Sequence, residues 1–340
     1  MNPARFEAIT AQYAKLRVAV AGDFCLDRYL EIDAARPEVS IETGLPVYNV
    51  TNARSQPGGS GTILNNLAAL GVGTIYPIGF AGQDGEGYEL KRALRARPGV
   101  CVDHFFQTPR RRTFTYTKPL VLTPDQPPRE LNRLDLKNWT PTPRVVETRL
   151  IKSIQTAARE VDAIILLSQV DVDETGVITR RVLQAVGELA RQHPKLLILA
   201  DSRRGLRGYP PVGLKMNLAE LGALTGTASG NDLKAIKNTA AELARRQGQP
   251  VFITMAERGI LGALPDGRVE HSPCLPVRGP IDIVGAGDSV TANLAAALAA
   301  GAALPEALEL ANAAASIVIH QLGTTGTASV ARIRALSGLE

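Results

Sequence analysis

The stretch DIVGAGDSV, residues 282–290, places small residues between two carboxylates, just ahead of an Ala/Leu-rich run. Glycines such as Gly285 and Gly287, which flank Ala286, mark a tight turn or a close approach to the backbone. Because the run from Ser289 is predicted to be a helix, the turn lies at a helix N-terminus, where unpaired amides and the helix dipole favour an anion. Asp288 then points a carboxylate at that anion. This is unfavourable unless the carboxylate accepts a proton there, the alternative being an ordinary acidic residue at a helix start.

The pattern of elements around this stretch predicts an α/β protein. Short apolar, β-branched runs alternate with amphipathic runs over more than two hundred residues, which is typical of a doubly wound, mostly parallel sheet flanked by helices. The predicted strands are 17–24, 74–82, 163–169, 195–201, 251–256 and 260–273, and the predicted helices are 62–71, 85–96, 174–192, 217–224, 231–248, 288–300 and 304–319. We expect residues 1–340 to form a single domain.

Two segments depart from this alternation. Residues 28–57 and 104–122 show β-like patterns without a helical period, and we expect them to pair as a small β lid over a site. The Pro- and charge-rich residues 123–145 are predicted to form an exposed loop. Exposed edges on lid strands favour a homodimer.

Composition narrows the class of protein further. Hydrophobic residues make up 45% and charged residues 21%, as in ordinary folded domains. Three dispersed cysteines give neither a disulfide framework nor a zinc-binding spacing, and no segment has the pattern of a secretion signal or a membrane span. The net charge of +5 includes one short basic run, Arg110–Arg112, which favours an anionic small molecule over nucleic acid. We therefore expect a cytoplasmic protein that binds small molecules, and neither nucleic acid nor membrane.

Polar residues and glycines gather at the predicted carboxyl ends of the strands, where ligands of open α/β sheets bind. A Walker P-loop is missing, and the first strand ends in AGDFCLD without a dinucleotide-binding G-x-G-x-x-G. An oxidoreductase is therefore disfavoured. An anion-binding turn with an adjacent carboxylate, together with candidate Mg²⁺ ligands, indicates a phosphoryl transferase.

Three stretches of the chain carry a family resemblance. DIVGAGDS resembles the C-terminal signature of the PfkB (ribokinase-like) carbohydrate kinases, and residues 57–87, beginning PGGSGT, resemble their N-terminal signature. KMNLAE (215–220) is similar to the N-x-x-E motif of the family, and the likeness extends from about Val18 to Leu336. Within the family, AGDFCLDRYLEID, RTFTYTK, RLD and LANAAASIVIHQLGT look most like the heptose-7-phosphate kinase module.

The resemblance implies a ribokinase-like fold, ATP and Mg²⁺ as cofactors, K⁺ as a further possible ion, and a role for each matching residue. Asp288 would be the general base, and the amides of Gly285, Ala286 and Gly287 would form the anion hole. The remaining implied residues fall into four groups: Asn217 and Glu220 for Mg²⁺ through water and the nucleotide; Gly259, Asn312 and Gly323 for the nucleotide; Asp27, Gly58, Gly59 and Asn66 for the sugar; and Asp282 for a monovalent cation.

The expected acceptor, a sugar phosphate, follows from the same resemblance and from the positive charge of the second lid segment. Arg112 and Lys118 lie on the second lid segment, where they would bind the phosphate of a sugar phosphate, most simply heptose 7-phosphate. The chain departs from the family pattern at Val284, Thr62 and Gln169, on the sugar side of the site. Two alternatives therefore stay open: a kinase of a free sugar or nucleoside, and a non-catalytic relative that only binds a sugar or nucleotide.

Overall fold

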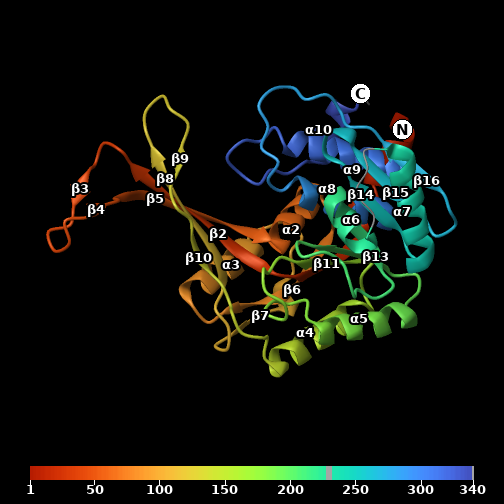
Figure 1. The fold of residues 1–340 in the computed structure, drawn as a ribbon, viewed down its shortest axis with the longest axis horizontal. Helices are drawn as coiled ribbons and strands as arrows, with labels where there is room; N and C mark the ends of the chain where they lie inside the picture. Colours follow the sequence, from red (N-terminus) through yellow and green to blue (C-terminus); the bar gives the residue numbers. More distant parts are fainter. Residues whose placement is uncertain (227–231, 339–340) are drawn as a thin grey trace.

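A large, mostly parallel sheet forms the centre of the protein, which we describe from a computed structural model over residues 1–226 and 232–338 (Figure 1). Its strand order is β16-β15-β14-β13-β12-β11-β1-β6-β7, with only β15 and β16 antiparallel to their neighbours. The strands are β1 (Arg17–Gly22), β6 (Thr74–Gly82), β7 (Phe105–Thr108), β11 (Ala163–Ser168), β12 (Leu197–Ser202), β13 (Gly213–Asn217), β14 (Val251–Thr254), β15 (Ile260–Ala263) and β16 (Val269–Ser272). Strand β1 has β6 on one side and β11 on the other, so the strand order of the sheet changes direction beside β1. In α/β proteins ligands bind at such a point.

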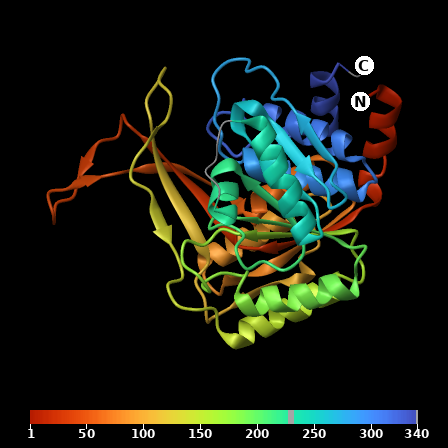
Figure 2. The same cartoon turned by 45° about the vertical axis from the view of Figure 1, so that its right-hand side comes forward.

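Helices cover both faces of this sheet and create two apolar cores (Figure 2). One core lies under α1 (Pro3–Thr10), α2 (Ser60–Ala69), α3 (Gly85–Arg95), α8 (Ala286–Ala299), α9 (Leu304–Val318) and α10 (Val330–Leu336). The other lies under α4 (Arg144–Ala157), α5 (Arg180–Gln192), α6 (Leu218–Thr225) and α7 (Leu233–Gln247). Neighbouring β1 residues serve opposite cores, Val18 the first and Ala19 the second, because side chains alternate across a strand. The predicted α/β, doubly wound fold is confirmed.

A second, smaller sheet projects from the body as a long arm (Figures 1 and 2). Its order is β10-β8-β2-β5, with β9 also paired to β8. The strands are β2 (Phe24–Asp33), β5 (Val50–Gly59), β8 (Phe114–Leu122), β9 (Arg129–Glu130) and β10 (Leu134–Leu136), and a two-stranded hairpin of β3 (Glu38–Val39) and β4 (Pro46–Val47) extends it. Strand β2 follows β1 after a single residue, so the small sheet begins at the ligand-binding end of the large one.

Several boundaries differ from the sequence-based expectations. Of the segment 104–122, only β8 joins the small sheet, because Phe105–Thr108 pairs with β6 and becomes the edge of the large sheet. The predicted loop 123–145 contains β9 and β10, which pair with β8. The polar composition of this segment gave no sign of these strands. Helix α4 was not predicted, and α5 begins at Arg180, six residues after the expected start. Residue 231, the expected start of α7, lies outside the described residues.

No helix in the described part of the chain combines the length and the apolar character needed to cross a membrane.

Candidate active site

The glycine-containing turn of DIVGAGDSV ends at the N-terminus of α8. Gly285 is the N-cap residue and has a left-handed backbone (φ 84°), which glycine adopts without strain. A Cβ on Gly285 would lie 3.4 Å from the side chains of Thr62 and Thr325, so this turn packs against the start of α2. The N–H of Ala286, one of the three amides that the family resemblance implies for an anion hole, donates to the carbonyl of Ile283 at 3.2 Å in this structure. First-turn amides such as that of Gly287 have no partner one turn earlier in the helix and can meet an anion.

Asp288 lies in the first turn of α8. Burial raises the pKa of its carboxyl to about 7, the neighbouring Asp201 and Asp27 carboxylates add to the rise, and the Lys215 ammonium opposes it. A carboxylate with a pKa near 7 can accept a proton and release it again at neutral pH, as a general base must. Asp288 therefore has a carboxyl that exchanges its proton near neutral pH, unlike an ordinary acid at a helix start.

Lys215 and Asp201 form a buried ion pair, and neither residue was assigned a role from the sequence, although both lie at the carboxyl ends of strands. Their side chains come from the neighbouring strands β13 and β12, and Lys215 Nζ donates to Asp201 Oδ2 at 2.9 Å. Thr291 of α8 donates to the same carboxylate oxygen at 3.0 Å. A Cβ built on Gly287 would lie 3.0 Å from Lys215 Nζ, so this ammonium is directly beside the helix terminus. The sequence feature that could have indicated this pair is the lysine of KMNLAE, two residues before Asn217.

Asn217 and Glu220 cap α6 reciprocally. Glu220 N–H donates to Asn217 Oδ1 at 2.9 Å, and Asn217 N–H donates to Glu220 Oε2 at 2.7 Å. Burial raises the pKa of Glu220, and the carboxylate of Asp201 adds to this effect. Residues 1–226 and 232–338 contain no cluster of three or more side chains able to chelate a metal by themselves. The acidic donors present suit Mg²⁺ that keeps its water and phosphate ligands.

A cavity of about 630 Å³ opens on one side of this terminus. Asn217, Gly259, Gly287 and Asn312 are among the residues that line it, together with apolar side chains such as Ile283. The Asn312 amide donates to Ser272 Oγ at 3.1 Å, so Asn312 also holds the strand end that borders the cavity. The size and the mostly apolar lining suit the base and ribose of a nucleotide.

Asp27 and the Gly58–Gly59 pair meet on the small sheet. A Cβ on Gly58 would lie 2.3 Å from Asp27 Oδ2, and one on Gly59 (φ 57°) would lie 2.4 Å from the carbonyl of Asp23. Neither position has room for a side chain, because Asp27 and the backbone of Asp23 already fill the space where a Cβ would lie. Lys118 Nζ lies 3.6 Å from Asp27 Oδ1. These four residues therefore form one polar group beside Asp288, whose pKa Asp27 influences.

Two residues implied in sugar binding are placed differently. Asn66 is fully buried within α2, and its amide donates to the carbonyl of Thr62 in the same helix at 3.0 Å, so its side chain belongs to the helix packing. Arg112 is exposed in the loop before β8, where its backbone exchanges hydrogen bonds with the Asn138 side chain. Its neighbour Arg111 is buried and donates to the carbonyls of Thr140 and Thr175 at 2.6 and 3.0 Å. The basic run at 110–112 thus lies before the lid strand and not on it.

Asp282 and Gly323 line a different cavity from the nucleotide-sized one. It has a volume of about 520 Å³ and lies between the body and the small sheet, with Lys118 on its far wall. Asp282 Oδ1 accepts the N–H of Val284 at 3.0 Å, which holds the turn ahead of α8. Gly323 therefore lies on the small-sheet side of the turn and does not line the cavity with Asn312 and Gly259.

Comparison of the sequence with known proteins gives a family match. A sequence model described as "pfkB family carbohydrate kinase" matches residues 23–331. The bifunctional protein HldE of Azorhizobium caulinodans is 32% identical over 309 residues, which are 90% of this chain and 61% of that relative. The chain thus spans less than two thirds of the curated relative that it matches.

Solved structures share the fold at low sequence identity. The ribokinase of Arabidopsis thaliana complexed with ribose and ATP superposes with a TM-score of 0.65 at 18% identity, over 95% of this chain and 98% of that one. The phosphofructokinase-2 of Escherichia coli in complex with fructose-6-phosphate gives a TM-score of 0.67 at 19% identity, over 95% and 98% of the two chains.

Proposed function

Because the chain belongs to the pfkB family of carbohydrate kinases, we propose that it transfers the γ-phosphate of ATP to a hydroxyl of a sugar phosphate, with heptose 7-phosphate as the favoured acceptor. The observation that carries the proposal is the position of Asp288. Its carboxyl, with a pKa of about 7, lies in the first turn of a helix, next in the chain to Gly287 of the nucleotide-sized cavity and within electrostatic range of Asp27. A protein that only binds its ligands needs no such base.

Each group has one task in this reaction. Asp27 and the backbone at Gly58 and Gly59 orient the acceptor, and Asp288 takes the proton of the attacking hydroxyl. The hydroxyl oxygen forms a bond to the γ-phosphorus while the bond from phosphorus to the bridging oxygen breaks, and its electron pair leaves with ADP. The first-turn amides of α8 and the ammonium of Lys215 stabilise the negative charge on the transferred group.

The cofactors follow from the same arrangement. The ATP base and ribose occupy the cavity lined by Gly259 and Asn312, so that the triphosphate reaches the start of α8. Mg²⁺ carried by the triphosphate is held through water by Glu220 and Asn217, and it neutralises phosphate charge. For Asp282, whose Oδ1 accepts the N–H of Val284 in the turn before α8, we keep a role near a monovalent cation such as K⁺.

The small sheet serves as a lid in this proposal. Strands β2 and β8, from segments 28–57 and 104–122, pair in parallel along nine residues, so movement of one strand must carry the other. Closure over the acceptor would exclude water that competes with the sugar hydroxyl for the γ-phosphate.

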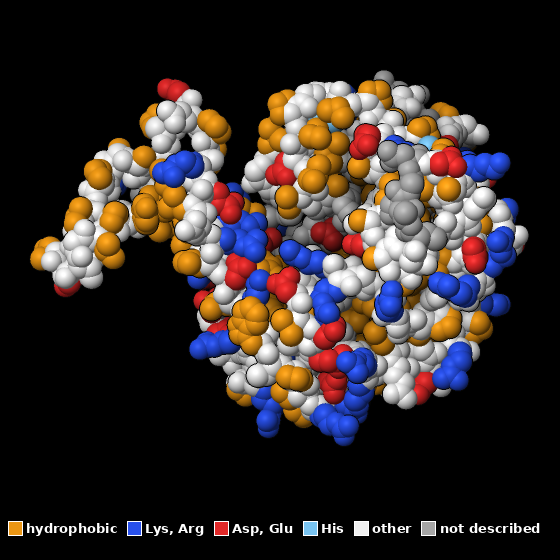
Figure 3. Space-filling model, in the orientation of Figure 1, with side chains coloured by type: hydrophobic (Ala, Val, Ile, Leu, Met, Phe, Trp, Pro, Cys, Tyr) orange, Lys and Arg blue, Asp and Glu red, His pale blue; other side chains and the backbone are white. Residues whose placement is uncertain are grey.

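We also propose that the protein is a homodimer formed through the projecting arm. Val39, Ile41, Leu45 and Tyr48 are exposed on or beside the β3–β4 hairpin, and Ile41 is 98% exposed. Figure 3 shows hydrophobic side chains along the projecting arm. Two-stranded hairpins are marginal on their own, and exposed apolar residues next to edge strands favour pairing with another chain. β5 is an edge strand of the small sheet and continues this surface.

The test of the activity is ADP release with a panel of acceptors. We expect turnover with heptose 7-phosphate and less with fructose 6-phosphate, and loss of both in Asp288→Asn. A higher kcat/KM for a free sugar would move the protein to the ribokinase or fructokinase type. No turnover with any acceptor, combined with measurable ATP binding, would support the non-catalytic alternative.

A further inference from the structure

Asp23 is a buried carboxylate directly after β1, and the proposed reaction gives it no task. Its Oδ2 accepts the N–H groups of Gln169 at 2.8 Å and Val170 at 3.3 Å, and its Oδ1 accepts that of Val177 at 2.6 Å. These donors lie at the two ends of residues 169–177, which we call the connecting loop because they lie between β11 and α5. One carboxylate therefore holds both ends of this loop.

The backbone of Asp23 reaches the acceptor side of the proposed site. Its carbonyl accepts the N–H of Ser60, the first residue of α2, at 3.0 Å. The same carbonyl oxygen lies 2.4 Å from the position that a Cβ on Gly59 would take, and Cγ of Gln169 lies 3.4 Å from that position. Asp23 thus joins the turn at Gly59 to the start of the connecting loop, and the Gln169 side chain lies against this turn.

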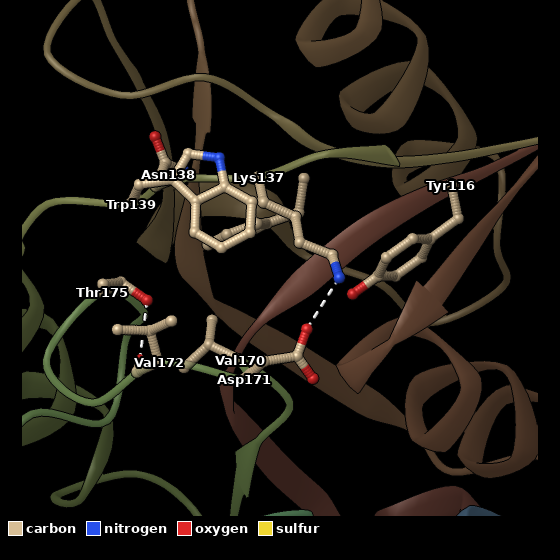
Figure 4. A pocket seen from close by; sticks show the side chains of 9 residues that line it. Tyr116, Lys137, Asn138, Trp139, Val170, Asp171, Val172 and Thr175 are labelled. Atoms are coloured by element: carbon tan, nitrogen blue, oxygen red, sulfur yellow. Dashed lines mark hydrogen bonds and ion pairs between the residues drawn. The ribbon is translucent and has the colours of Figure 1, made fainter. Parts of the chain in front are cut away.

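The connecting loop also packs against the small sheet and the residues just beyond β10 (Figure 4). Lys137 Nζ donates to Asp171 Oδ2 at 2.7 Å, as a dashed line in Figure 4 marks. Tyr116 and Trp139 line one side of a narrow pocket and Val170 lines the other, and this pocket has room for about one water. The position of the loop is therefore linked to that of the small sheet.

The hydrogen bonds to Asp23 are the kind that a buried carboxylate needs. Burial raises the pKa of Asp23, and the N–H groups of Val177, Gln169 and Val170 oppose this rise. Hydrogen bonds to a charged acceptor are stronger than those between neutral groups. An asparagine would keep the size of the side chain, but its amide nitrogen is a donor and would face the N–H groups at one end of the loop. Asp23→Asn should therefore release one of the two ends.

We propose that Asp23 is a positioning residue for the acceptor: its carboxylate fixes the connecting loop and, through Gln169, the wall beside the Gly59 turn against which the sugar binds. This inference rests on the proposed function and adds a residue that acts through others. The residues that line the nucleotide-sized cavity in the described part of the chain include neither Asp23 nor the connecting loop. Loss of the carboxylate should therefore weaken binding of the acceptor and spare that of ATP.

Hydrogen–deuterium exchange tests the attachment of the loop without turnover. In Asp23→Asn, exchange of amides in the connecting loop should accelerate about 10- to 100-fold, the effect of losing a hydrogen bond to a charged group. Asp162→Asn is the matched control, because Asp162 directly precedes β11 and its carboxylate accepts the N–H of Arg17, at the start of β1, at 2.8 Å. This control should leave exchange in the connecting loop unchanged.

A second variant disturbs the same contact from the side of the loop. A Cβ on Gly176 would lie 2.4 Å from Asp23 Oδ1, so Gly176→Ala should displace the carboxylate from the N–H of Val177 while keeping its charge. This variant also supplies the measurement if Asp23→Asn does not fold.

Steady-state kinetics separate a positioning role from a contribution to stability alone. In Asp23→Asn and Gly176→Ala we expect KM for heptose 7-phosphate to rise about 10-fold, with kcat and KM for ATP within about twofold of wild type, because ground-state and transition-state binding of the acceptor are lost together. Asp162→Asn should change none of the three parameters.

Two results would overturn the proposal. Unchanged exchange in Asp23→Asn would show that the carboxylate does not hold the connecting loop. Faster exchange with an unchanged KM for the acceptor, or with equal rises in KM for acceptor and ATP, would show that Asp23 serves stability alone. A wild type without turnover would instead contradict the proposed function, and the Kd for heptose 7-phosphate from calorimetry would then replace KM in deciding the role of Asp23.

Discussion

The ammonium of Lys215 lies 2.9 Å from a carboxylate oxygen of Asp201, and both groups influence the pKa of Asp288. Burial works against the charged form of Lys215, but the Asp201 carboxylate raises the pKa of the lysine above its ordinary value. The lysine therefore remains a cation beside the start of α8. It lowers the pKa of Asp288 while Asp201 raises it, so the pair adjusts a pKa that burial already raises.

The pH dependence of kcat/KM should show the influence of Lys215 and Asp201 on Asp288. Because Asp288 must be deprotonated to accept a proton and has a pKa of about 7, kcat/KM should rise tenfold per pH unit below pH 7 and level off above it. Lys215→Met removes the opposing cation and should move the midpoint to higher pH, whereas Asp201→Asn should move it to lower pH. Profiles of the three proteins measured from pH 5 to 9 test this. A midpoint unchanged in both variants would show that the Lys215–Asp201 pair does not influence the pKa of Asp288.

Removal of the base should separate binding from chemistry. In Asp288→Asn the side chain keeps its size but cannot take the hydroxyl proton, so kcat should fall by about 10²- to 10⁴-fold. Calorimetry should still detect ATP and acceptor with nearly unchanged Kd. A variant that retained the wild-type kcat would exclude Asp288 as the general base.

The same substitution should change how stability depends on pH. The pKa of Asp288 is about 7 in the folded chain and 3.8 without the fold, so between these values the folded protein holds the proton more tightly. The contribution of this group to stability is therefore lost as pH rises from about 4 to 7. Asp288→Asn, which carries no charge, should have a higher Tm than wild type at pH 8, and the gain should shrink toward pH 4. Thermal melts at both pH values decide the matter, and a constant difference would contradict it.

Closure of the proposed lid should protect β2 and β8 together. These strands share a continuous parallel ladder, so binding of the acceptor should slow hydrogen exchange in both to a similar extent. The measurement is hydrogen–deuterium exchange with and without ATP and heptose 7-phosphate, with α4, a helix of the body, as an internal reference. Protection of one strand without the other would argue against a common lid.

The dimer should depend on the apolar residues of the arm. Ile41→Glu places a charge at a side chain that is 98% exposed in the monomer, so folding should be unaffected while self-association weakens. Light scattering after size-exclusion chromatography should give a dimer for wild type and a monomer for the variant. Glu42→Gln, next to it in the chain and likewise exposed, is a control expected to remain dimeric. A wild-type protein that is monomeric would contradict the proposed homodimer.

The sequence by itself determined the class of fold and the local form of the α8 terminus. Alternating apolar runs of strand and helix period fix which segments bury which face, and this information is local. For the same reason the turn at Gly285 and the helix after it were predictable: Gly285 has the left-handed backbone that glycine favours, and α8 begins at Ala286, two residues before the predicted start. The pairing of the 28–57 segment with β8 also followed from strand-like patterns, although the share of 104–122 in the large sheet did not.

Only the tertiary structure decided which charges share a site. Lys215 and Asp201 are 14 residues apart and meet because β12 and β13 are neighbours in the sheet, a non-local fact that no residue pattern contains. The run at 110–112 shows the converse, because three adjacent arginines suggest one binding surface, whereas the fold buries Arg111 in backbone hydrogen bonds and leaves Arg112 exposed. Burial and strand order, and not the residue types alone, determine which cations are available to a ligand.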